Sequence, residues 1–228
     1  MELLVSTDWL AKELGASDLR IVDATKFMPG LGDGSRVVLY DDSPLKSAAR
    51  AWWMLTIFGA HEVAILDGGI AKWKAEGRPL ETGKEALRHR HFTVWKDEKD
   101  VRTKADLLAN LHSKDEQVVD ARPADRFSGE TPDPRGNTAS GHIPGSTNIP
   151  HSSFFNADGT WKSSDEIKAI FNDAGIDLSK PLVTTCGSGM TAAVISFAAA
   201  LAGAEKTALY DGSWAEWGAD ADTPKETA

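Results

Sequence analysis

Cys186 is the single cysteine among the 228 residues, and the residues around it favour a reactive thiol. The apolar run at residues 182–185 predicts a buried strand, and the Ala-, Val- and Leu-rich stretch that follows the loop predicts a buried helix. Gly187 and Gly189 allow the intervening backbone to curl so that its amide groups face inward. These amides and the positive end of the helix favour an anion, and the nearest anion is the thiolate of Cys186. We therefore expect Cys186 to ionise readily and to act as a nucleophile, although many free cysteines are simply buried as small apolar side chains.

Two arginines, Arg126 and Arg135, lie in a polar stretch rich in Pro and Gly and could bind an anionic substrate. A guanidinium group matches the paired oxygens of a carboxylate or a sulfonate. The alternative is that both arginines pair with neighbouring acidic side chains on the surface, where ion pairs contribute little. Spacing alone leaves both interpretations open. His142, in a Gly-His-Ile-Pro-Gly turn, could be an acid–base group, but its place beside the turn favours a structural role.

Composition and charge limit the partners. The formal net charge of −9 and a sequence pI of about 5.1 disfavour nucleic acid and anionic membrane surfaces, yet they allow an anionic substrate in a local site. One cysteine excludes an internal disulfide and a cysteine-rich metal site, and the Arg-His-Arg-His run at 88–91 is more typical of a solvated surface than of a metal site. No apolar run approaches the roughly 18 residues of a membrane span, and the N-terminus does not resemble a secretory signal, so we expect a cytoplasmic protein.

The order of predicted elements repeats along the chain. Ile-Val-Asp-Ala at residues 21–24 corresponds to Val-Val-Asp-Ala at 118–121, and later landmarks recur at a spacing of 144, as in Asp67 and Asp211 (211 − 67) or Trp73 and Trp217. Apolar runs that alternate with helical patterns predict parallel sheets with helices on both faces. We therefore expect an α/β protein of two related domains, at residues 1–80 and 101–228, joined by a linker at 81–100.

The two copies differ in chemistry and in length. Asp42 occupies the position that corresponds to Cys186 (186 − 144), so only the second copy can carry thiol chemistry. Early landmarks lie 97 residues apart (120 − 23), so the first copy is 47 residues shorter (144 − 97), with the gap between about Phe27 and Ser35. We expect the first domain to be a shortened, non-catalytic copy with a narrower sheet.

The six-residue loop that begins at Cys186, the Gly-His-Ile-Pro-Gly turn and the Asp-Gly motifs followed by tryptophan resemble the rhodanese superfamily. Within it the loop resembles that of the tandem-domain 3-mercaptopyruvate sulfurtransferases, since thiosulfate-using rhodaneses typically carry basic residues there and this loop has none. The resemblance covers essentially the whole chain apart from the gap. Members usually also have a His-Ile-Pro-Gly turn and an acidic residue in the first domain, and those positions fall within the gap.

The resemblance implies a role for each matching residue. Cys186 matches the nucleophile that takes up sulfur as a persulfide, and Ser188 matches a group beside the sulfur and the leaving enolate. Arg126 and Arg135 match the pair that binds the carboxylate and keto oxygen of the substrate. The other residues of the implied cradle are Gly187, Gly189, Met190 and Thr191. The resemblance implies no metal or organic cofactor.

The activity so implied is transfer of sulfur from 3-mercaptopyruvate to cyanide, a small thiol or a thioredoxin-type dithiol, with release of pyruvate. Thiosulfate is the nearest alternative donor, which the neutral loop disfavours because a dianion favours a cation there. A cysteine phosphatase would need an arginine six residues after the cysteine, where this chain has Ala192. A non-catalytic sulfur-carrier module is a further alternative, favoured if the shortened first domain leaves the pocket open.

Overall fold

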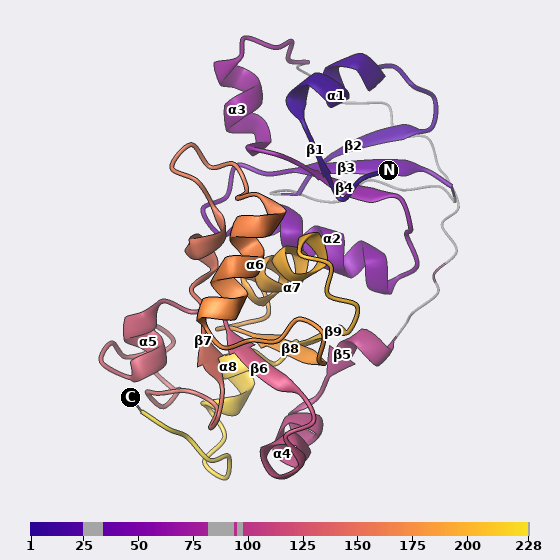
Figure 1. Ribbon diagram of the computed structural model, residues 1–228. Coiled ribbons are helices and arrows are strands. Elements are labelled where there is room, and N and C mark those ends of the chain that lie inside the picture. Colours follow the sequence, from indigo (N-terminus) through magenta and orange to yellow (C-terminus); the bar gives the residue numbers. More distant parts are fainter. Residues whose placement is uncertain (25–33, 82–93, 95–97, 228) are drawn as a thin grey trace. The chain divides into compact units, whose positions relative to one another are not determined.

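A computed structural model describes residues 1–24, 34–81, 94 and 98–227, and the chain forms two compact units (Figure 1). The first unit comprises Met1–Asp97 and Phe155–Trp161, and the second comprises Glu98–Phe154 and Lys162–Ala228. Most of the predicted linker at 81–100 lies outside the described residues. Residues 155–161, which the predicted division placed in the second domain, belong to the first unit, where Asp67 accepts a hydrogen bond from the backbone N–H of Trp161.

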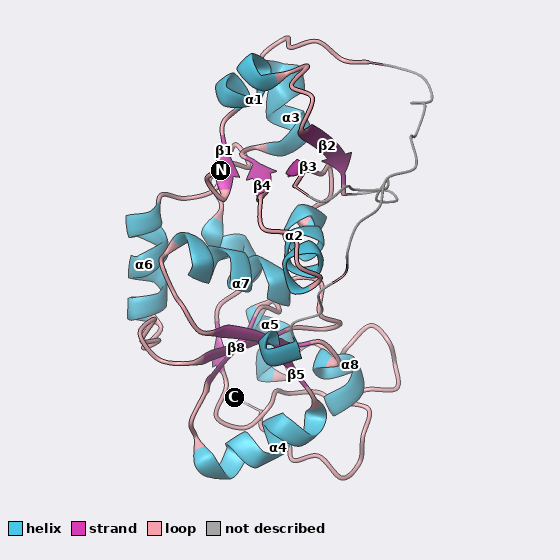
Figure 2. Cartoon of the chain, turned by 90° about the vertical axis from the view of Figure 1, so that its right-hand side faces the viewer, coloured by secondary structure: helices cyan, strands magenta, loops and turns pink. Residues whose placement is uncertain are grey.

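Within the described residues, four parallel strands form the sheet of the first unit, in the order β1-β4-β3-β2. Helices α1 and α3 lie on one face of this sheet and α2 lies on the other (Figure 2). The strands are β1 Leu4–Val5, β2 Leu19–Asp23, β3 Arg36–Tyr40 and β4 Val63–Leu66, and the helices are α1 Thr7–Glu13, α2 Ser47–Ile57 and α3 Gly69–Ala75.

Five parallel strands form the sheet of the second unit, in the order β5-β9-β8-β6-β7. Helices α6 and α7 lie on one face, and α4 and α8 lie on the other (Figure 1). The strands are β5 Val101–Arg102, β6 Gln117–Asp120, β7 Thr147–Asn148, β8 Leu182–Thr185 and β9 Thr207–Tyr210. The helices are α4 Lys104–Ser113, α5 Ala124–Ser128, α6 Ser164–Asp173, α7 Ala192–Leu201 and α8 Ser213–Trp217, with short 3₁₀ turns η1 Glu98–Asp100 and η2 His151–Phe154.

The two sheets confirm the predicted fold class, and among the described residues the sheet of the first domain is narrower by one strand. Strand β7 pairs with β6 at one edge of the second sheet. The counterpart of β6 in the first unit is β2, which is itself the edge strand among the described residues. Residues 25–33, where the shortfall was placed, lie outside the described residues.

The core of the second unit fixes the position of the Cys186 loop. Strand β8 is buried at all four positions, because β6 and β9 flank it and helices cover both faces of the sheet. Helix α7 is buried at every residue from 192 to 199, as its apolar composition predicts. The loop between β8 and α7 is therefore anchored at both ends by fully buried elements.

The described helices are short, and several begin at well-formed caps. Ser6 accepts a hydrogen bond from Trp9 N–H at the start of α1, and Thr103 and Ser163 form capping boxes with Asp106 and Glu166. The eleven residues of α2 make it the longest helix that the structure describes. No helix in this part of the chain has the length and apolar character needed to cross a membrane.

Candidate active site

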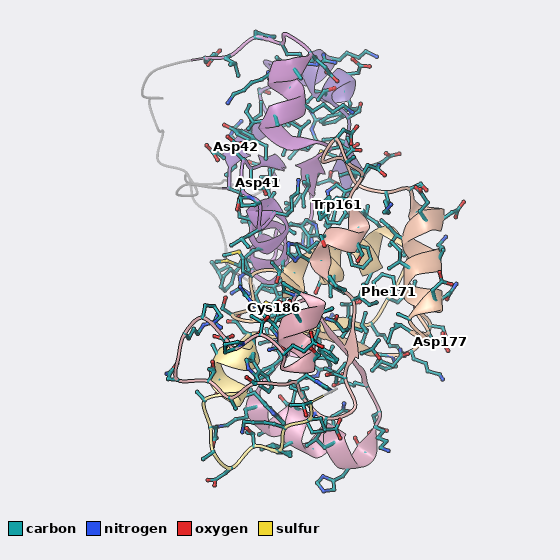
Figure 3. All side chains as sticks on the ribbon, turned by 90° about the vertical axis from the view of Figure 1, so that its left-hand side faces the viewer. Asp41, Asp42, Trp161, Phe171, Asp177 and Cys186 are labelled. Carbon is teal, nitrogen blue, oxygen red and sulfur yellow. The ribbon has the colours of Figure 1, made fainter. Side chains whose placement is uncertain are left out.

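Cys186 lies at the carboxyl end of β8, in the centre of the second sheet, and is 1% exposed (Figure 3). The loops that follow the two neighbouring strands bond directly to this region. Ala121 N–H, after β6, donates to the carbonyl of Thr185 at 2.9 Å, and Trp214 N–H, after β9, donates to the carbonyl of Cys186 at 2.9 Å. The carboxyl ends of three parallel strands therefore meet at the thiol, which is where ligands collect in open α/β sheets.

The amide groups of the loop divide between two acceptors. Ser188 N–H donates to the sulfur of Cys186 over 3.4 Å, in the direction that stabilises a thiolate. The N–H groups of Cys186 and Gly189 donate instead to the hydroxyl of Ser213, at 3.2 and 2.9 Å. Ser213 was not among the predicted site residues, and it is the loop's main side-chain partner in this structure.

The remaining predicted loop residues line the same turn. Ser188 is exposed, and Gly187 and Met190 are half-buried. The carbonyl of Gly187 accepts a hydrogen bond from Ala215 N–H at 2.9 Å. Thr191 is buried and stands at the N-cap of α7, where its side chain makes no capping hydrogen bond. The exposed Ser188 and half-buried Gly187 are thus the part of the loop nearest to solvent.

The structure brings Arg135 to the loop. A Cβ atom added at Gly187 would lie 3.2 Å from Nη2 of Arg135, so the guanidinium packs directly against this glycine. Nη1 of the same group donates to both carboxylate oxygens of Asp133, at 3.1 and 3.0 Å. Burial would raise the pKa of Asp133, but the hydrogen bond from the Arg135 amide and the Arg135 charge outweigh it and lower that pKa. Arg135 therefore fits both predicted interpretations, since it pairs with an acidic neighbour and also lies beside the Cys186 loop.

Arg126 lies on α5 and is half-buried. Within the described part of the chain, its guanidinium has no hydrogen-bond or ion-pair partner, so the surface pairing considered from the sequence does not occur there. The structure does not record a contact between Arg126 and the Cys186 loop.

A buried ion pair supports the surroundings of the loop. Arg122 and Asp120 pair at 2.7 Å with side chains 4% and 1% exposed, and Arg122 also donates to the carbonyl of Gly141. The Arg122 guanidinium lies over the ring of Trp214, 4.5 Å from its centroid. Trp214 is itself 1% exposed and donates its indole N–H to the carbonyl of Ala139, so it packs in the core.

His142 has the structural role that its turn favours. Its Nδ1 lies 2.8 Å from the carbonyl oxygen of Phe127, and the two rings stack with centroids 3.8 Å apart. Its backbone exchanges hydrogen bonds with Glu226 in both directions. The described residues contain no group of three or more His, Cys, Asp and Glu side chains placed to hold a metal ion, and the basic run at 88–91 lies outside them.

The comparison with known families matches residues 22–76 and 103–220 to the rhodanese-like domain, once for each unit. The chain belongs to the rhodanese family. It is 46% identical over 190 residues to mouse 3-mercaptopyruvate sulfurtransferase and 41% identical over 197 residues to that of Escherichia coli K12. These alignments cover 82% and 86% of this chain, and 64% and 70% of the relatives. Rat thiosulfate sulfurtransferase is 41% identical over 191 residues, covering 82% of this chain and 64% of the relative.

The solved structures agree with this assignment. The crystal structure of SseA, a 3-mercaptopyruvate sulfotransferase from Escherichia coli, superposes with a TM-score of 0.82 and 30% identity, covering 94% of this chain and 99% of that one. YnjE, at 22% identity and a TM-score of 0.84, shares the fold. The rhodanese chain described here spans less than two thirds of the length of its mammalian relatives, at 64%.

The first rhodanese unit has carboxylates where the second has Thr185 and Cys186. Asp42, the counterpart of Cys186, is exposed, and its neighbour Asp41 is buried beside it at the start of α2 (Figure 3). The Asp41 carboxylate accepts N–H groups of Ala48 and Ser43, at 2.6 and 3.4 Å. Burial raises the pKa of Asp41, and these two hydrogen bonds oppose the rise. The side chain of Asp41 thus occupies the N-terminal end of α2, beside a pocket of about 310 Å³.

Proposed function

We propose that this rhodanese transfers sulfur from 3-mercaptopyruvate through a persulfide on Cys186 and releases pyruvate. The observation that carries the proposal is the joint placement of the Cys186 sulfur, the Ser188 amide and the Arg135 guanidinium at one loop. A thiolate, a hydrogen-bond donor aimed at it and a cation suited to a carboxylate are the groups that this transfer needs. The relatives at 44–46% identity, which are named 3-mercaptopyruvate sulfurtransferase, support the same donor, while thiosulfate sulfurtransferases match at 41–42%.

The first half-reaction is a displacement at the donor's sulfur. The Cys186 thiolate forms a new S–S bond, the C–S bond of 3-mercaptopyruvate breaks, and its electron pair leaves as the enolate of pyruvate. The enolate takes up a proton to give pyruvate, and Cys186 is left as a persulfide. Arg135 beside Gly187 is positioned to bind the donor's carboxylate, and the exposed Ser188 can donate to the developing negative charge.

In the second half-reaction an acceptor thiolate attacks the outer sulfur, so the S–S bond breaks and the Cys186 thiolate is restored. Only 1% of Cys186 is exposed, whereas the adjacent Ser188 is exposed, which favours small donors and a small or extended acceptor thiol. We propose a small thiol or a thioredoxin-type dithiol as acceptor, with cyanide as a laboratory substitute. A single unpaired cysteine is also consistent with the reducing cytoplasm.

Intact-mass analysis tests the proposal directly. After incubation with 3-mercaptopyruvate the wild type should gain the mass of one sulfur, and Cys186→Ser should gain none. Steady pyruvate release with added thiol should be abolished in the same variant, because serine cannot form the persulfide. Sulfur uptake without turnover would indicate a carrier module, and faster uptake from thiosulfate would make thiosulfate the donor. Equal activity of the Cys186→Ser variant would refute the assignment.

A further inference from the structure

Ser213 begins α8 and is fully buried, with 0% exposure. Its hydroxyl accepts the N–H groups of Cys186 and Gly189 and donates to the carbonyl of Tyr210 at 2.9 Å. The next two residues of the helix, Trp214 and Ala215, donate their N–H groups to the carbonyls of the loop at residues 186 and 187. The first turn of α8 therefore holds the nucleophile loop at four of its backbone groups.

The backbone of Ser213 is in a conformation that normally selects glycine. Its φ angle is +51°, in the left-handed region where a side chain is unfavourable. The corresponding residue of the first unit is Gly69 (213 − 144), with φ of +58°, and a Cβ atom there would lie 2.8 Å from the carbonyl oxygen of Asp41. The two units thus share the turn, but the second one retains a strained side chain. Strain of this kind persists where the surrounding contacts maintain it, and it points to a role for the hydroxyl.

The two loops also differ in what satisfies their amides. In the first unit the carboxylate of Asp41 accepts N–H groups at the start of α2. The second unit has the neutral Thr185 at that position (41 + 144), and there the Ser213 hydroxyl, from the neighbouring strand's loop, accepts a different pair of loop amides, those of Cys186 and Gly189. A carboxylate beside Cys186 would repel a thiolate, whereas a neutral hydroxyl satisfies the same kind of donor without adding charge.

We propose that Ser213 is a positioning residue for the Cys186 reaction. Its hydroxyl fixes the amides of residues 186 and 189, so that the amide of Ser188 is left directed at the sulfur. Without the hydroxyl, two buried N–H groups lose their acceptor and the loop must turn to satisfy them, which moves the Ser188 amide out of line. The inference rests on the proposed role of Cys186 as the nucleophile, but it concerns the thiol itself and not the identity of the donor.

The test is the pH dependence of Cys186 alkylation by iodoacetamide in the full-length protein. We expect Ser213→Ala and Ser213→Gly each to slow alkylation about tenfold at neutral pH and to alter the pH–rate profile, since a displaced Ser188 amide no longer donates to the sulfur. The glycine variant relieves the left-handed strain and keeps the test informative if the alanine variant folds poorly. Ser196→Ala is the matched control. That hydroxyl is also buried, at 4% exposure, but it pairs with Thr184 on α7 and β8, and its removal should leave the profile unchanged.

Two outcomes would overturn the proposal: a wild-type profile for the folded Ser213→Gly variant, or an equal shift in Ser196→Ala. Persulfide formation from 3-mercaptopyruvate gives an independent readout, in which kcat should fall by a similar factor and KM should stay near the wild-type value. Failure of the wild type to form any persulfide would remove the sulfurtransferase activity, while the alkylation comparison would still decide the role of Ser213.

Discussion

Arg135 and Arg126 differ in what else their charges do. Arg135 is anchored by Asp133, whereas the Arg126 guanidinium has no ion-pair partner within the described residues. Removing Arg135 therefore removes a cation from the loop and leaves a buried carboxylate without its partner. Removing Arg126 deletes a charge without breaking any recorded contact. The two positions should separate substrate binding from stability.

We predict that Arg135→Ala lowers kcat/KM for 3-mercaptopyruvate about 10- to 100-fold, because a charge-assisted hydrogen bond contributes roughly 1.5–3 kcal/mol. The effect with thiosulfate should be smaller. Arg126→Ala should lower the same constant while leaving the melting temperature near that of the wild type, whereas Arg135→Ala should also lower the melting temperature. Steady-state kinetics with both donors and thermal unfolding provide the measurements.

Arg102→Ala controls for the loss of one positive charge, because Arg102 pairs with Glu116 and makes no recorded contact with the loop. It should leave the donor preference unchanged. If both Arg126→Ala and Arg135→Ala keep the wild-type preference for 3-mercaptopyruvate over thiosulfate, the two arginines do not bind the substrate as proposed.

Asp133 makes the stability of the second unit depend on pH, and the direction of its pKa shift gives the sign of that dependence. Because the folded-state pKa of Asp133 is lowered, its carboxylate contributes stability above the unfolded-state value of about 3.9, and that contribution is lost as the pH falls through the folded-state pKa. Asp133→Asn should therefore be less stable than the wild type near neutral pH, by about 1 kcal/mol, and the difference should shrink toward about pH 3. Urea unfolding at both pH values measures this, and a difference that grows on acidification would contradict it.

At the scale of single elements, helices α6 and α4 both begin with a capping box. Ser163 and Thr103 each accept the backbone N–H of the third helical residue, whose carboxylate in turn accepts the N–H of the cap. We predict that Ser163→Ala destabilises the protein by about 1 kcal/mol, and that Thr103→Ala has an effect of the same size. Both variants should keep the alkylation profile of Cys186, since neither cap contacts its loop. If the free energy of unfolding falls by well below about 0.5 kcal/mol in both variants, the two capping boxes contribute little to the stability of this protein.

The elements around Cys186 could be predicted because local sequence determines them. Strand β8 has the bounds expected from its apolar run, and α7 follows the loop as its composition predicts. The role of Ser213 could not be predicted, since it depends on a left-handed backbone angle and on partners 24 and 27 residues away in the chain. The pairing of Arg135 with Asp133 was one of two open interpretations, because spacing does not tell whether a loop arginine also reaches the Cys186 loop.

At the scale of the whole molecule, recurring landmarks in the sequence predicted the duplication. They did not predict where the chain passes from one unit to the other. Residues 155–161 leave the second unit after η2 and return before α6, and in between they belong to the first unit. No apolar pattern in the sequence indicates that residues 155–161 belong to the first unit. The segment is held by a few specific contacts: Asp67 accepts the N–H of Trp161 at 2.9 Å, and Lys46 donates to the carbonyl of Gly159 at 3.3 Å.

We predict that Asp67→Ala releases this segment. The N–H of Trp161, a residue that is 7% exposed, would lose the Asp67 carboxylate as acceptor, and a buried donor without a partner costs about 1–3 kcal/mol, which corresponds to roughly 5- to 150-fold faster amide exchange. Asp67→Asn keeps one carbonyl oxygen at the same position and should exchange at close to the wild-type rate. Hydrogen exchange followed by NMR at residues 155–161 distinguishes the variants. If Asp67→Ala and Asp67→Asn exchange alike at Trp161, this hydrogen bond does not hold the segment, and the packing of the Phe155 and Trp161 rings, whose centroids lie 4.4 Å apart, must do so instead.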